Sequence, residues 1–103
     1  MTIENANVVE KKKVTNRIYK EPGKYKVVVF NDNVTTADFV VIMLINIFHL
    51  AQDTAIKLMQ EIHNEGSAVA GVYTFEIAEQ KSKEATNLAR QNGFPLAVKM
   101  EAE

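Results

Sequence analysis

The feature that most constrains the fold is an apolar run from Phe39 to Phe48, in which Asn46 is the single polar residue. Thr35 and Asp38, just before the run, resemble a capping box with Asp in place of Glu, so we expect a helix to begin there. A helix that is apolar on every side must be covered by more than one neighbour or lend one side to a groove. The run has about half of the roughly 20 residues that cross a bilayer, so it predicts a core helix.

The flanking segments predict the element order β-α-α-β-α-β. Runs of β-branched and aromatic residues, typical of strands, lie at residues 25–30, 67–73 and 94–100. Apolar residues recur with helical periodicity at residues 54–65 and 75–91. Asp53 and Thr74 stand where they can cap the two later helices, and Gly66 and Asn92-Gly93 stand where these helices end. We predict one small open-faced α/β (α+β) domain of two layers, in which three helices cover one face of a three-stranded antiparallel sheet.

The residues of the third predicted helix form an apolar arc that should face the core, and one charged residue falls within this arc. Its inward residues are expected to be Phe75, Ala78, Ala85, Leu88 and Ala89. Lys81 falls inside this arc, so either its stem lies along the edge of the core or the arc is partly uncovered and offers a contact surface.

The composition separates an arm from the core and limits the classes of partner. Residues 1–24 are polar and end in Glu21-Pro22-Gly23, so we expect a flexible arm before a core at 25–103. The net charge of −1 gives no basic field for nucleic acid. The absence of cysteine fits a reducing compartment, and no hydrophobic run follows Lys11-Lys12-Lys13 as in a signal peptide. A cytoplasmic monomer without a membrane segment is the expectation.

Catalytic chemistry has little support in the sequence. A serine-histidine-aspartate triad would need Ser67 or Ser82 with His49 or His63, and neither serine lies in a nucleophile-elbow motif. Two histidines without cysteine are also a poor ligand set for zinc. The residues therefore favour a binding protein over an enzyme.

Polar residues at two places suggest a binding site. His63 lies on the apolar arc of the second helix, either as a core histidine bonded to a backbone carbonyl or as a ligand-binding residue. Asn31-Asp32-Asn33 either only forms a turn or also supplies acceptors. If the two segments converge, a carboxylate, an amide oxygen and a neutral imidazole could hold an ammonium group beside an apolar hole.

The chain resembles the ClpS family of Clp protease adaptors over residues 25–102. The matching residues are Tyr25 to Asp32, Thr35, Phe39, Val40, Met59, His63, Gly66, Gly71 to Thr74, Ala78, Glu79, Lys81, Pro95 and Leu96. The resemblance implies an adaptor without enzymatic activity or cofactor. Such an adaptor binds N-terminal Phe, Leu, Tyr or Trp and delivers the substrate to a Clp AAA+ unfoldase such as ClpA, partnered with ClpP.

The resemblance also implies a role for individual residues. Asn31, Asp32 and His63 would hold the α-amino group of the substrate. The side-chain pocket would be lined by Thr35, Thr36, Ala37, Val40, Met59, Ile62 and Leu96. Glu76, Glu79 and Lys81 would meet the N-terminal domain of the unfoldase, and the arm would serve substrate transfer.

The loop after the first strand departs from the family pattern Asn-Asp-Asp-x-Thr-Pro-Met. Asn33 replaces the second carboxylate, Thr36 the proline and Ala37 the methionine, which in the family works as a gate that crowds branched Cβ atoms. Our hypothesis is that Ala37 admits N-terminal Ile and Val besides Leu and Phe, and that looser packing could weaken the binding of Leu. Two alternatives stay open: a ClpS-like regulator that docks on the unfoldase without binding N-termini, and an unrelated small α/β binding domain.

Overall fold

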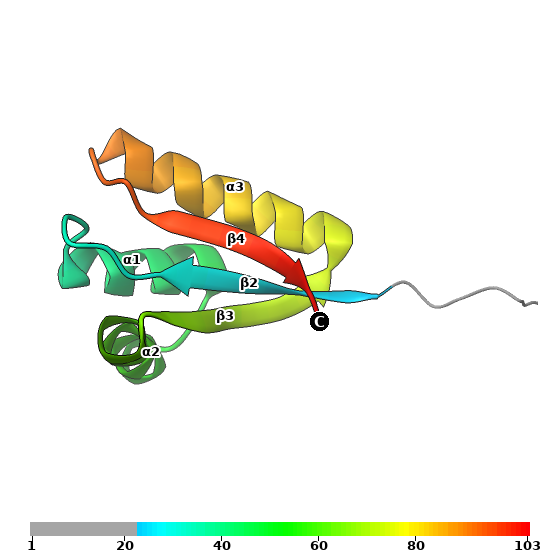
Figure 1. Cartoon of the computed structure of the whole chain (residues 1–103), viewed down its shortest axis with the longest axis horizontal. Helices are drawn as coiled ribbons and strands as arrows, with labels where there is room; N and C mark the ends of the chain where they lie inside the picture. The colour runs from blue at the N-terminus through cyan, green and yellow to red at the C-terminus, as the bar shows by residue number, and fades with distance from the viewer. Residues whose placement is uncertain (1–22) are drawn as a thin grey trace, which may run out of the picture.

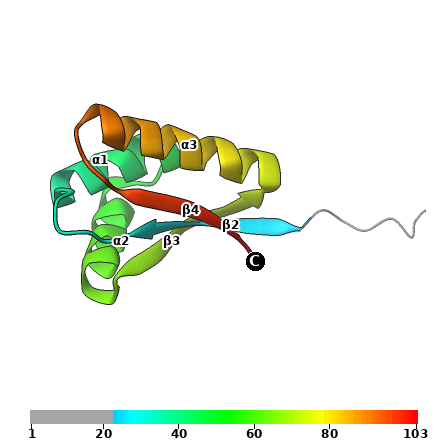
Figure 2. The ribbon, with the colours of Figure 1, turned by 45° about the horizontal axis from the view of Figure 1, so that its top comes forward.

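The computed structural model describes residues 23–103 and confirms the predicted order of elements (Figures 1 and 2). The elements are β2 (Lys24–Phe30), α1 (Ala37–Phe48), α2 (Gln52–Glu65), β3 (Ser67–Thr74), α3 (Phe75–Gln91) and β4 (Ala97–Ala102). Of the predicted arm, residues 1–24, all but the last two residues lie outside the described part. Lys24 already belongs to the first strand.

The sheet has the order β3-β2-β4, and the central strand β2 pairs antiparallel with both neighbours. Val27 and Val29 of β2 are fully buried, and Ala68 and Val98, the cross-strand neighbours of Val29, are buried with them. The opposite face is open, since Val69 and Val72 are 39% and 42% exposed. Figures 1 and 2 show α1 and α3 on one side of the sheet, as the open-faced prediction requires.

Helix α1 is covered on one side and exposed on the other, although both sides are apolar. Met43 and Leu44 are fully buried in the core, whereas Ile42 is 52% exposed. Both options left by the sequence hold: α2 and α3 pack against the helix, and its exposed side borders a groove described below. Within residues 23–103, no helix is long and apolar enough to cross a membrane.

Two predicted helix caps are wrong by one or two residues. The N-cap of α1 is Thr36, whose hydroxyl accepts from the Phe39 amide at 3.2 Å, because the hydroxyl of Thr35 is bonded to Asp32 instead. Helix α2 has its N-cap at Ala51, whose carbonyl accepts from Ala55, and Asp53 lies inside the first turn. Thr74 does occupy the N-cap of α3, but its side chain accepts no bond from that turn.

Helix α3 buries most of the predicted arc. Ala78, Ala85 and Ala89 are fully buried and Leu88 is half-buried, but Phe75 is 47% exposed and its predicted inward position is wrong. Phe75 begins the helix at the edge of the core, where its ring packs edge-on against Tyr25 with centroids 5.3 Å apart. The N-terminal end of α3 therefore presents an aromatic surface to solvent.

The last strand begins later than the predicted start at residue 94. The amide of Phe94 donates to Ala89 and closes the end of α3. The guanidinium of Arg90 donates to the carbonyls of Phe94 and Leu96 at 2.9 and 3.0 Å, so these groups do not join the sheet ladder. Strand β4 therefore starts at Ala97.

Lys81 is bound inside the fold by its charged end. The ammonium donates to the carbonyl of Ile47 at 2.9 Å, near the end of α1. It also lies 6.0 Å from the ring centroid of Phe48 and 5.5 Å from that of Tyr73. The stem thus lies along the edge of the core, and the ammonium ties α3 to the C-terminal end of α1, where unpaired carbonyls favour a cation.

The two sides of α1 give a stability prediction. We expect Leu44→Ala to lower the free energy of unfolding by about 2–5 kcal/mol through a lost buried side chain and a cavity. Ile42→Ala, two residues earlier and largely exposed, should change it by less than about 0.5 kcal/mol. Urea denaturation followed by circular dichroism would measure both, and equal losses in the two variants would contradict the described packing of α1.

Candidate functional site

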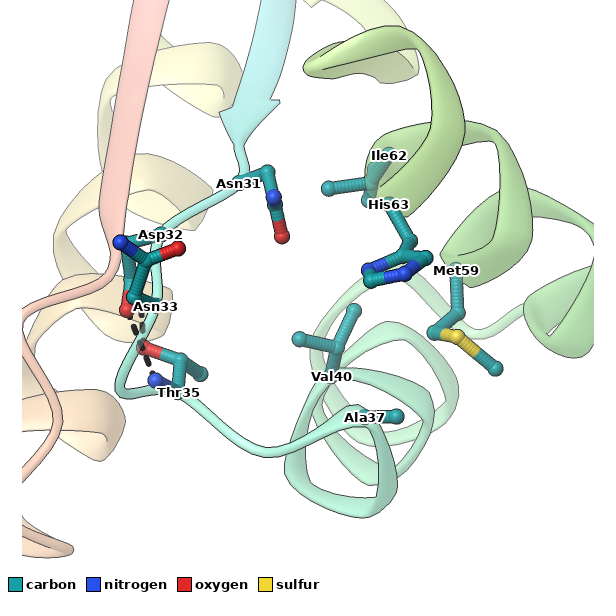
Figure 3. A pocket seen from close by; sticks show the side chains of 9 residues that line it. All are labelled: Asn31, Asp32, Asn33, Thr35, Ala37, Val40, Met59, Ile62 and His63. Atoms are coloured by element: carbon teal, nitrogen blue, oxygen red, sulfur yellow. Dashed lines mark hydrogen bonds between the residues drawn. The ribbon is translucent and has the colours of Figure 1, made fainter.

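A cavity of about 290 Å³ lies between the β2–α1 loop, the start of α1 and the last turns of α2. Nine residues line it: Asn31, Asp32, Asn33, Thr35, Ala37, Val40, Met59, Ile62 and His63 (Figure 3). Its volume is at the lower end of the roughly 300–1,000 Å³ of small-molecule sites, so it suits one side chain better than a large cofactor.

The cavity has an apolar floor and a polar rim. Val40 and Ile62 are 6% and 2% exposed and form part of the core. Asn31, Asn33 and His63 are exposed at the rim. Figure 3 shows the Asn31 amide and the His63 imidazole reaching from opposite walls toward the same space. The turn and His63 therefore lie around one cavity, as predicted. Because His63 is exposed, its interpretation as a core histidine is wrong.

Gly66 holds these two walls together. The amide of Asn31 donates to the carbonyl of Gly66 at 2.9 Å, and the amide of Gly66 donates to Ile62 at 3.0 Å in the last turn of α2. Gly66 has a φ of 96°, a left-handed conformation that a side chain would strain. The end of β2 and the end of α2, which carries His63, are therefore fixed relative to each other by backbone bonds.

The Asp32 carboxylate shapes the loop between β2 and α1. One oxygen accepts from the amides of Val34 and Thr35 at 2.8 and 2.7 Å, and the other accepts from the Thr35 hydroxyl at 2.7 Å. Burial acts to raise the pKa of Asp32, but these bonds and the nearby Arg90 charge outweigh it and hold the pKa below its usual 3.8. Asp32 is therefore ionised at neutral pH and contributes negative charge beside the cavity.

The arrangement is suited to an ammonium ion attached to an apolar group. The amide oxygen of Asn31 and a neutral imidazole nitrogen of His63 can each accept a hydrogen bond, and the Asp32 oxygens retain lone pairs. A charge-assisted bond to such acceptors is about twice as strong as a neutral one. The floor of Val40 and Ile62 offers no polar partner, so only an apolar side chain would be stabilised there.

The structure separates the predicted pocket residues into two groups. Thr35, Ala37, Val40, Met59 and Ile62 line the cavity together with Asn31, Asp32 and His63. Thr36 is outside the lining and caps α1, and Leu96 is 1% exposed in the core, outside the cavity lining. Asn33, which was considered with Asn31 and Asp32 as a possible acceptor but was not among the predicted pocket residues, also lines the cavity.

The residues predicted to meet an unfoldase lie on the first turns of α3. Glu76 is exposed, and Glu79 lies 3.7 Å from Lys83 in an exposed ion pair that contributes little stability. Lys81 is half-buried with its ammonium on Ile47. The two glutamates remain available to a partner, whereas Lys81 is held by the fold. Within the part described, no three histidine or acidic side chains gather as metal ligands.

The comparisons with known proteins agree with this fold. Residues 20–99 match the family described as "ATP-dependent Clp protease adaptor protein ClpS". The chain belongs to the ClpS family. Its curated relatives include ClpS adapter proteins from Acetivibrio thermocellus, 45% identical over 89% of this chain and 93% of that one, and from Campylobacter jejuni, 48% identical over 81% and 86%. The chain is therefore an adaptor of a Clp protease and not an enzyme.

A solved ClpS structure has the same fold. Agrobacterium tumefaciens ClpS2, bound to L-phenylalaninamide, superposes with a TM-score of 0.79 and 42% sequence identity. The match covers 81% of this chain and all of that one. The three helices and the open antiparallel sheet are thus the architecture of a ClpS protein.

The Asp32 bonds predict a pH dependence of the loop. A carboxyl whose pKa is lowered by folding stabilises the fold above its usual 3.8, and this stabilisation is lost as the pH falls through the lower folded-state pKa. Carbon NMR of the Asp32 carboxyl should therefore give a midpoint below 3.8. Thr35→Val, which loses a donor, should raise that midpoint, whereas Thr35→Ser should keep it. A native midpoint at or above 3.8 would refute the bonding described.

Proposed function

We propose that this adaptor binds the free N-terminus of substrates that begin with Leu, Phe, Tyr or Trp, and delivers them to a Clp AAA+ unfoldase. The observation that carries the proposal is the meeting of Asn31 and His63 above the apolar floor of Val40 and Ile62. The ammonium of the first residue is bound at the rim, and its side chain enters the cavity.

The ligand of the solved relative supports this assignment. L-Phenylalaninamide combines a free α-amino group, a Phe side chain and an amide in place of the carboxylate, so it has the chemistry of an N-terminal Phe. A peptide N-terminus presents an ammonium, an apolar side chain and a continuing amide in this same order. The polar rim suits the ammonium, and the apolar floor suits the side chain.

The interaction energies are sufficient for useful affinity. Burial of a Leu or Phe side chain contributes about 1.5–3 kcal/mol. Each charge-assisted hydrogen bond to the ammonium adds about 1.5–3 kcal/mol. Micromolar binding needs about 8 kcal/mol. One buried side chain and three such bonds supply up to about 12 kcal/mol, which meets this value when association costs about 4 kcal/mol.

Delivery is assigned to a different surface of the adaptor. Glu76 and Glu79 on α3 would contact the N-terminal domain of a ClpA-like unfoldase, with Lys81 orienting α3 through its bond to Ile47. The segment 1–24 would act in substrate transfer. The cytoplasmic location and the monomeric state expected from the sequence stay predictions.

Binding of peptides that differ at residue one tests the proposal. In fluorescence anisotropy, peptides with free N-terminal Leu and Phe should bind with micromolar affinity. An acetylated Leu peptide, which has lost the charge and the ammonium donors, should bind at least about tenfold more weakly. His63→Ala should weaken the free Leu peptide, while His49→Ala, at the far end of α1, should not. If none of the peptides binds, a regulator that docks without binding N-termini would replace this proposal.

Because residue 37 is alanine, we expect the adaptor to accept more kinds of N-terminal residue in its substrates. The side chain of Ala37 is a single methyl group at the cavity wall and leaves room for a branched Cβ. Peptides with N-terminal Ile or Val should therefore bind the native chain several-fold more tightly than they bind Ala37→Met, measured in the same assay. An Ile peptide that binds both proteins equally would show that residue 37 does not set this preference.

A further inference from the structure

A second hollow of about 460 Å³ adjoins the cavity, between α1 and α2. Val41 and Ile42 of α1 and Ile56 and Met59 of α2 make it mainly apolar, with Asp38 and Gln52 as its polar members. Ile42 is 52% exposed, so the groove presents a large aliphatic side chain to solvent. The proposed binding of the first residue does not use this groove.

The groove and the cavity share a wall. Met59 lines both hollows, and Asp38 of the groove directly follows Ala37 of the cavity. Because Ala37 carries a single methyl group, the rim between the two hollows is low. Met59 is unbranched and half-buried, so it can adapt to a ligand that crosses this rim.

The direction of the bound peptide follows from the position of its ammonium. Asn31 and His63 hold the amino group, and Figure 3 shows Ala37 on the side of the cavity away from Asn31. With the amino group held there, a carbonyl end that leaves over Ala37 is directed toward Asp38 and the groove. Asn33 and Thr35 line the other side of the mouth.

The spacing of Ala37 and Val41 along α1 matches the spacing between the first and third residues of an extended substrate. In an extended peptide, side chains alternate between faces, so residues one and three point the same way, about 6.6 Å apart. Ala37 and Val41 are four residues apart on α1, which is about 6 Å along the helix axis. A peptide with its first side chain in the cavity thus directs its third toward Val41 and Ile42, while its second points to solvent.

We propose that the groove between α1 and α2 is a subsite for an apolar third residue of the substrate. This inference rests on the proposed function, because the first residue fixes the register. An aliphatic side chain would contact Val41, Ile42 and Ile56, whereas an acidic one would be repelled by Asp38. The adaptor would therefore recognise two residues of a substrate. It would bind the first through its amino group and side chain, and the third through apolar contacts.

The test compares peptides of two compositions, each in two orders. Anisotropy with the full chain would use fluorescein-labelled peptides that begin Leu-Gly-Leu, Leu-Gly-Ser, Leu-Leu-Gly and Leu-Ser-Gly and share one tail. We expect Leu-Gly-Leu to bind about fivefold more tightly than Leu-Gly-Ser, as partial burial of one leucine allows. The Leu-Leu-Gly and Leu-Ser-Gly pair should differ by less than about twofold.

Two matched variants locate the effect. Ile42→Ser should reduce the ratio between Leu-Gly-Leu and Leu-Gly-Ser to near one. Ile77→Ser, which replaces an isoleucine of α3 that is 42% exposed, should leave the ratio at about five. Tight binding of all four peptides without a preference at residue three, or a ratio unaffected by Ile42→Ser, would overturn the subsite while leaving the proposed function intact. Failure of every free N-terminus to bind would overturn the proposed function itself.

Discussion

The carboxylate of Asp32 determines the path of the chain between the central strand and the first helix. Its bonds to Val34 and Thr35 close a tight turn, and this turn sets where α1 starts. If the turn opened, Ala37 and Val40 would no longer face the end of α2. The same negative charge lies beside a rim suited to an ammonium ion, so one group serves both the geometry and the electrostatics of the site.

Backbone bonds fix the opposite wall. Gly66 ends α2 in a left-handed conformation and accepts from Asn31, so the strand end and the helix end are joined without a side chain. The apolar run of α1 completes the arrangement, because Met43 and Leu44 face the core while Val40 forms the floor of the cavity. Because the cavity is preformed, the protein loses little conformational entropy when it binds a peptide.

The proposed binding cavity and the proposed delivery surface lie at opposite ends of the domain (Figure 1). The cavity lies at the start of α1 and the end of α2, whereas Glu76 and Glu79 lie at the start of α3. Lys81 connects α3 to the end of α1 through Ile47. An adaptor must hold a substrate and its unfoldase at once, and this separation would let one chain do both without the two partners colliding.

The order of the elements and the location of the site were largely predictable from the sequence, because its local patterns agree with the global fold. The apolar runs and turn residues gave the order of six elements, and the position of His63 on an apolar arc indicated a site. Side-chain competition was not predictable: Thr35 bonds to Asp32, so Thr36 caps α1, and Arg90 takes the carbonyls that would have extended β4. The position of Phe75 at the edge of the core includes a ring contact with Tyr25, a partner distant in sequence.

The assignment of the cavity to a free N-terminus is tested most directly by an NMR titration of the labelled chain. The two ligands are L-phenylalaninamide and its N-acetylated form. The free amine should shift the amide signals of residues 31–37 and 59–63, which surround the cavity, and the acetylated form should leave them nearly unchanged. Equal shifts with both compounds, or shifts confined to other residues, would contradict the assignment of the cavity to a free N-terminus.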